Sequence, residues 1–244
     1  MFENEEQVKK FIEKYEKYYF KGTYNKSNKF GRCGVKSTYV EDEEIIMKEL
    51  CKGNHNKYVI AWKFGNYRKN KEICINNMFN GYRNIDMGNY IEGVDEQKDC
   101  ITKIFEEIES KIINGNIEGV REDLEEIYNI LLKVAPSYFG MVYIINSMFF
   151  LSKGKIPIYD KNVYKAMKAL CDNIKPIEVR KLYNPNKIDS DKVIDRLIEY
   201  MCMLDEVFGV YKTTKSVNFD RCECVGYISR GLDRALWVYG QLKN

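Results

Sequence analysis

The residue with the clearest chemical potential is Asp160, which follows Pro157 after a short gap. The residues after it have the three- and four-residue apolar spacing of an amphipathic helix, so Asp160 is expected at that helix's N-terminus. The helix dipole favours the ionised form of a carboxylate at this end. An ionised carboxylate can stabilise a developing cation or orient a water molecule. The same position is also typical of a plain helix cap, which requires no function.

The stretch around Asp160 is basic, although the net charge of the whole chain is only +3. Between Lys133 and Lys187 there are 10 basic and 3 acidic side chains, a balance of +7. A positive face of this kind can meet nucleic-acid phosphates. Lysine is also a common residue on solvated helix faces, which explains the pattern equally well. We take Lys153 to Lys181 as the candidate nucleic-acid face.

The cysteine and histidine pattern argues against a metal site. The chain has 8 cysteines and a single histidine, His55, and the cysteines are mostly scattered singly. Cys222 and Cys224 are separated by one residue, whereas structural zinc sites use cysteine pairs with gaps of at least about two residues. We therefore expect reduced thiols, no metal and no cofactor.

The longest apolar stretch, residues 138–151, is expected to be a buried core helix. It is interrupted by Gly140, Asn146 and Ser147, and it is shorter than the roughly 20 residues needed to cross a bilayer. The first residues mix acids and bases without the apolar segment of a secretory signal. We expect a soluble, cytoplasmic protein with no membrane partner, and the sequence leaves its oligomeric state open.

The periodicity of the apolar residues predicts a mainly α fold. We expect helices over residues 5–20, 41–51, 95–113, 118–134, 137–151, 160–169, 191–208 and 225–239. Residues 65–94 are rich in Gly and Asn and read as an irregular connector. We expect residues 1–244 to form one compact unit with an N-terminal lobe (1–94), a central helical core (95–170) and C-terminal helices (171–244).

The segment from Pro136 to Met167 resembles the core of the helix-hairpin-helix DNA glycosylases. In that family a proline-started hairpin and a buried helix precede a second proline and a catalytic Asp, and here Asp160 lies 24 residues after Pro136. Ile158, Asn162 and Val163 further resemble the adenine mismatch glycosylases. Ser137, Tyr138 and Phe139 replace the family's Gly-hydrophobic-Gly turn, which suggests a divergent, 8-oxoguanine-glycosylase-like branch.

This resemblance implies a two-lobed helical bundle that flips a damaged or mismatched base out of DNA and releases it. Asp160 would be the catalytic carboxylate. Met141 stands where bifunctional members carry a lysine nucleophile, so the implied enzyme is monofunctional and uses water. The resemblance places DNA contacts at five further residues: Ser137, Gly140, Lys153, Lys155 and Lys161.

Two other readings stay open. The first is a non-catalytic DNA-binding or defence-associated module on the same fold, which the altered hairpin turn favours. The second is a helical interaction protein unrelated to DNA, in which Asp160 is only a cap and the lysines only face solvent.

Overall fold

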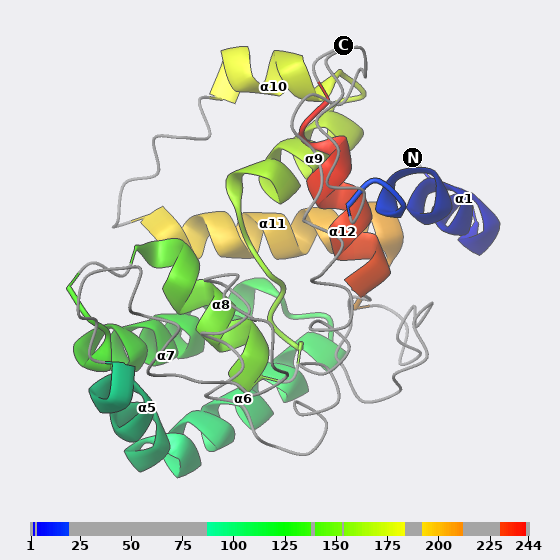
Figure 1. The fold of residues 1–244 in the computed structure, drawn as a ribbon. Helices are drawn as coiled ribbons and strands as arrows, with labels where there is room; N and C mark the ends of the chain where they lie inside the picture. The colour runs from blue at the N-terminus through cyan, green and yellow to red at the C-terminus, as the bar shows by residue number, and fades with distance from the viewer. Residues whose placement is uncertain are drawn as a thin grey trace. The chain divides into compact units, whose positions relative to one another are not determined.

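A computed structural model describes residues 2, 4–19, 87–137, 140–152, 154–183, 192–211 and 230–242 of the chain. These residues form helices joined by turns, with no strand among them, which confirms the mainly α prediction (Figure 1). None of the helices in these ranges is long and apolar enough to span a membrane. The predicted helix over 41–51 lies outside the described residues.

The chain divides into two compact units. The terminal unit contains Met1–Ser37, Pro157–Glu223 and Tyr227–Asn244, and the central unit contains Thr38–Ile156 and Cys224–Gly226. The sequence predicted one compact unit with three parts that meet at residues 94 and 170. These boundaries between the parts stay predictions.

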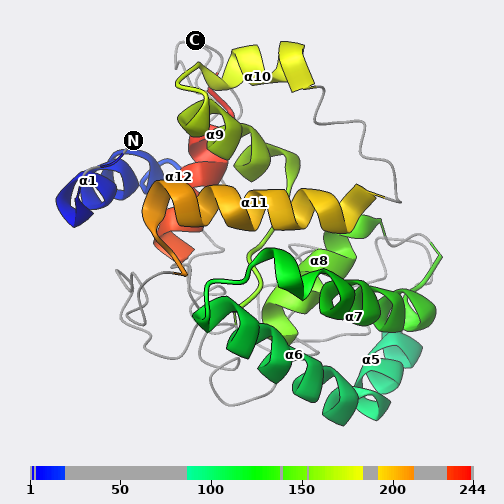
Figure 2. The same cartoon turned by 180° about the vertical axis from the view of Figure 1, so that it is seen from behind.

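The central unit is built around α7 (Arg121–Val134), which packs against α5 (Met87–Glu96), α6 (Lys98–Ile113) and α8 (Met141–Leu151) (Figure 2). A single 3-10 turn, η2 (Glu118–Val120), leads into α7. The apolar stripes of α6 and α7 face each other, and the side chains of Ile108, Ile112, Leu124, Ile127 and Leu131 are fully buried.

The helix α8 is the buried core helix that the sequence predicted. Ile144, Ile145 and Met148 have no exposed surface. Its two polar residues are also buried: Ser147 accepts a hydrogen bond from the Tyr90 hydroxyl at 2.5 Å, whereas both side-chain amide atoms of Asn146 lack a hydrogen-bond partner within the described part of the chain.

The terminal unit is built around α9 (Lys161–Cys171), which packs against α10 (Pro176–Tyr183), α11 (Val193–Phe208) and α12 (Arg230–Tyr239) (Figure 1). The first helix, α1 (Glu5–Glu16), lies against α12. An ion pair joins these two helices, in which Arg234 Nε donates to Glu16 Oε1 at 2.8 Å. Segments from both ends of the chain thus belong to this unit, with α12 packed on α9 and α1 packed on α12.

Several helices, α1, α6 and α7 among them, have ends that differ by a few residues from the prediction, and three helices differ in ways that have a clear physical reason or were missed. The helix α8 begins at Met141 rather than Ser137, because Pro136 and the exposed turn after it do not join the helix. The helix α5 begins inside the predicted connector, where glycines weakened the helical signal. One of them, Gly93, is required by packing, since a Cβ there would lie 2.7 Å from Val134 Cγ1 of α7. The short helix α10 was not predicted.

Candidate functional site

Asp160 is the N-cap of α9, as the sequence predicted. Its backbone is extended, with φ −148° and ψ 173°, and its side-chain Oδ1 accepts hydrogen bonds from the backbone N–H groups of Asn162 (2.6 Å) and Val163 (3.1 Å). The segment before it is fixed by burial, because Ile156, Ile158 and Tyr159 are at most 6% exposed. The carboxylate therefore has a defined position at the mouth of the helix.

The two oxygens of the Asp160 carboxylate have different surroundings. Both capping hydrogen bonds end on Oδ1. Among the described residues no donor binds Oδ2, and the residue is partly exposed. Among the described residues, one oxygen is thus anchored by the helix and the other is not engaged.

Two buried tyrosines lie beside the start of α9. The ring of Tyr159 packs edge-on against Tyr164, at 6.1 Å between centroids, and against Tyr200, at 5.7 Å. Tyr159 is 1% exposed and Tyr200 has no exposed surface, and neither hydroxyl has a hydrogen-bond partner among the described residues. Burial raises the pKa of both phenols, so both are neutral at physiological pH.

A charged network joins α9 to α11 on the same unit. The Arg196 guanidinium donates to Glu199 Oε2 at 2.7 Å and to the Tyr164 hydroxyl at 2.9 Å. The Lys168 amine lies 2.6 Å from the other carboxylate oxygen of Glu199. Burial raises the pKa of Glu199, but the hydrogen bonds and charges of the two cations outweigh this and hold its pKa below the usual value.

This network joins α9 to α11, and the sequence did not predict it. The i,i+3 spacing of Arg196 and Glu199 on a predicted helix was the only local signal. The pairing with Lys168 depends on which face of α11 meets α9. As a result, one lysine of the predicted nucleic-acid face is already bound to a carboxylate.

The turn that the resemblance assigns to DNA binding lies in the central unit. Ser137 and Gly140 are exposed, and Tyr138 and Phe139 lie outside the described residues. The carbonyl of Gly140 accepts from the Tyr143 N–H at 2.9 Å at the start of α8. A Cβ at Gly140 would meet no atom within 4 Å, so nothing in the described structure requires glycine there.

The structure gives a different result for each of the three candidate lysines. Lys155, in the central unit, forms an ion pair with Glu109, so its charge is compensated. Lys161, in the terminal unit, is exposed next to Asp160. Lys153 lies outside the described residues.

No three His, Cys, Asp or Glu side chains of the described ranges lie close enough together to hold a metal ion. Of the eight cysteines, Cys100, Cys171 and Cys202 are within those ranges, and none of the three forms a disulfide with another described cysteine. Burial raises the pKa of the Cys171 thiol to about 11, which makes it a poor nucleophile.

The chain was also compared with known proteins. No family model, no curated protein and no solved structure matches it.

Proposed function

We propose that this chain is a divergent, two-lobed member of the helix-hairpin-helix DNA glycosylase group that releases a damaged or mismatched base from DNA. The observation that carries the proposal is the state of Asp160. Its Oδ1 is anchored by two backbone N–H groups, its Oδ2 is not engaged by any described residue, and the side chain is partly exposed. A plain cap needs only the first of these properties.

In the proposed reaction the target nucleotide leaves the base stack, at a cost of a few kcal/mol, and its glycosidic bond breaks. The bonding electrons leave with the base, which takes up a proton, and the sugar becomes a cation resembling an oxocarbenium ion. Asp160 stabilises this cation through its free oxygen. Water then adds to the sugar carbon and loses a proton, which leaves an abasic site.

The route is monofunctional because no amine stands where bifunctional relatives carry their lysine. Met141 occupies that position, and a thioether cannot form a Schiff base with the sugar. Strand cleavage should therefore require alkali after base release.

Lys161 is the described lysine best suited to contact DNA beside Asp160. It is exposed, and it forms no ion pair with the described residues. Lys155 is held by Glu109 and should contribute less. Replacing Lys161 by Gln should weaken DNA binding and lower the slope of log affinity against log salt by about 1, whereas Lys155→Gln should change both quantities less.

A non-catalytic DNA-binding module is the second candidate. The capping hydrogen bonds alone account for an aspartate at this position, and the glycine turn of the family is replaced by Ser137 and its neighbours. In that case the protein would bind DNA with the salt dependence of phosphate contacts but would release no base.

The decisive experiment measures base release by the full chain from damaged and mismatched duplexes and from single strands, with and without alkali. Asp160→Asn should reduce the rate at least about a hundredfold, since a lost electrostatic stabiliser costs about 3 kcal/mol. Its thermal stability should change by about 1 kcal/mol or less, because an amide oxygen still accepts the two N–H groups. Asp99→Asn, an exposed first-turn aspartate of α6, is the matched control and should retain full activity.

Three results would contradict this proposal in whole or in part. DNA binding without base release from any substrate would favour the binding module. Base release that survives Asp160→Asn would mean that another residue is the catalytic carboxylate. Absence of any salt-sensitive DNA binding would instead favour a helical interaction protein unrelated to DNA.

A further inference from the structure

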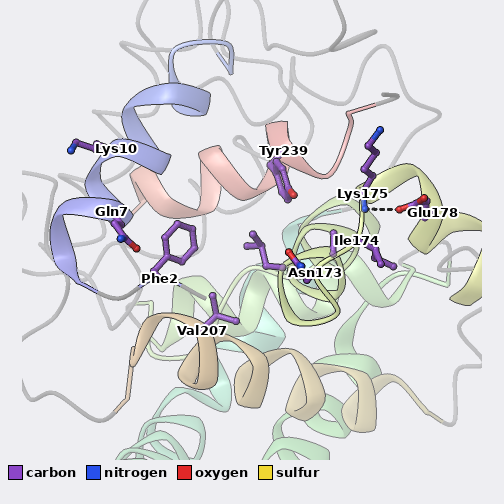
Figure 3. Close-up of a pocket in the computed structure, with 11 residues that line it drawn as sticks. Phe2, Gln7, Lys10, Asn173, Ile174, Lys175, Glu178, Val207 and Tyr239 are labelled. Carbon is purple, nitrogen blue, oxygen red and sulfur yellow. Dashed lines mark hydrogen bonds between the residues drawn. The ribbon is translucent and has the colours of Figure 1, made fainter.

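A cavity lies in the terminal unit at the C-terminal end of α9, the end opposite to the N-cap Asp160. Figure 3 shows its lining residues. It has a volume of about 730 Å³ and is lined by residues of α1, α9, α11 and α12, together with the turn into α10. Cavities of roughly 300 to 1,000 Å³ are typical of small-molecule sites. The lining residues come from positions as distant in sequence as Phe2 and Tyr239, so no local sequence pattern could predict this cavity.

The apolar part of the cavity is supported from behind by an aromatic cluster. The Phe2 ring stacks on Phe208, with 5.1 Å between centroids, and the Tyr239 ring packs against Tyr15 at 5.2 Å and Phe11 at 5.5 Å. Figure 3 shows the Phe2 and Tyr239 rings among the side chains that line the cavity. These two rings give the cavity apolar, aromatic walls suited to a planar ring system.

Two carboxamides accompany these rings. Gln7 comes from the first turn of α1, and Asn173 comes from the turn that ends α9 (Figure 3). Asn173 has a φ of 53°, and its exposed side chain forms no hydrogen bond with the described residues. A carboxamide offers both a donor and an acceptor, which matches the mixed edge of a heteroaromatic ring.

The charged residues at the edge of the cavity are mainly positive. Lys10 and Lys175 lie on opposite sides, and Glu178 is the only acidic residue among the described lining residues (Figure 3). Glu178 is used within the fold, because its Oε2 accepts from the backbone N–H of Lys175 at 2.8 Å. The Lys175 amine has no ion pair within the described chain, and the Lys10 pair with Glu6 is solvent-exposed and weak.

We propose that this cavity binds a small heteroaromatic anion, of which a nucleoside monophosphate is one example. The ring system occupies the space between Phe2 and Tyr239, the carboxamides of Gln7 and Asn173 contact its polar edge, and the anionic group lies near Lys10 or Lys175. Each part of the ligand is matched by a feature of the lining.

This site is separate from Asp160. The two lie at opposite ends of α9, whose 11 residues span about 16 Å. The inference therefore does not depend on the proposed glycosylase reaction, and loss of one activity should leave the other intact.

The experiment is calorimetric titration of the full chain with AMP, adenosine and inorganic phosphate. AMP should bind at least about tenfold more tightly than either of the other two, because only AMP has both the ring and the charge. Lys10→Gln or Lys175→Gln should weaken AMP binding about two- to fivefold, according to which of the two lysines the phosphate contacts. Lys9→Gln, an exposed neighbour on α1 outside the cavity, is the matched control and should bind AMP like the wild type.

A third variant tests the cavity itself. Val207 lines it and is 6% exposed, so Val207→Phe should occupy part of the space and abolish AMP binding. If that variant fails to fold, the lysine variants still decide, because both lysines are exposed. No AMP binding at millimolar concentration, equal affinity for AMP and phosphate, or affinity unchanged in both lysine variants would each overturn the proposal.

Discussion

The contact between α12 and the start of α9 gives the sharpest stability prediction. A Cβ on Gly240 would lie 1.9 Å from the carbonyl oxygen of Asn162 and 2.7 Å from its carbonyl carbon. Both are backbone atoms of the first turn of α9, so no side-chain rotation can relieve the contact. The φ of Gly240 is not positive, so the backbone conformation does not require glycine there. Glycine is required because there is no room for a Cβ.

The cost of Gly240→Ala can be worked from this geometry. Restoring an ordinary contact of at least 3.4 Å requires the two segments to separate by about 1.5 Å, which strains the packing of α12 on α9. Overpacking costs about 1 to 3 kcal/mol, and a backbone obstacle places this case at the upper end, about 3 kcal/mol. For a chain of this size the midpoint of thermal unfolding should fall by about 6 to 12 °C.

Two other glycines provide a graded control series. Gly140→Ala meets no atom within 4 Å and should change the free energy of unfolding by about 0.5 kcal/mol or less. At Gly231, within α12, the added Cβ would lie 3.3 Å from Ile12 Cγ2, a side-chain atom, and the better helix propensity of alanine should offset that contact. The assay is thermal and urea unfolding of all three variants. A Gly240→Ala protein as stable as the other two would refute the close approach of α12 to α9.

Three further predictions follow from buried or charged side chains. Asn146→Leu should raise the free energy of unfolding by about 1 to 3 kcal/mol in urea titrations, because it removes a buried amide that has no partner among the described residues. A lower free energy of unfolding would instead indicate that the amide has a partner elsewhere in the chain. The folded-state pKa of Glu199 lies below its usual 4.5, so the stability that its carboxylate contributes is present at neutral pH and is lost as the pH falls below about 4.5. Glu199→Gln should therefore flatten the dependence of unfolding free energy on pH in this acidic range. An unchanged dependence would contradict the network with Lys168. Burial raises the pKa of Tyr90 to about 12, so the ultraviolet difference between the wild type and Tyr90→Phe should show no phenolate signal near pH 10.

Asp160 could be identified as a candidate site residue from local sequence rules alone. An N-cap depends on a handful of consecutive residues, so Asp160 could be placed at the start of a helix before any packing was known. The buried helix over Ile144 to Phe149 was equally predictable, because near-uniform apolarity leaves no face for solvent. The helix α5 was missed because the space that Gly93 leaves for Val134 has no local signature.

The sequence by itself determined the mainly α architecture, most helix positions and the N-cap at Asp160, since these depend on interactions within a few residues. Only the tertiary structure decided that Lys155 is bound to Glu109, that Lys168 and Arg196 share Glu199, and that Phe2 and Tyr239 line one cavity. Each of these brings together separate segments of the chain. Charge and apolarity can be counted along a chain, but whether a lysine meets a phosphate or a carboxylate depends on which helix faces are packed together.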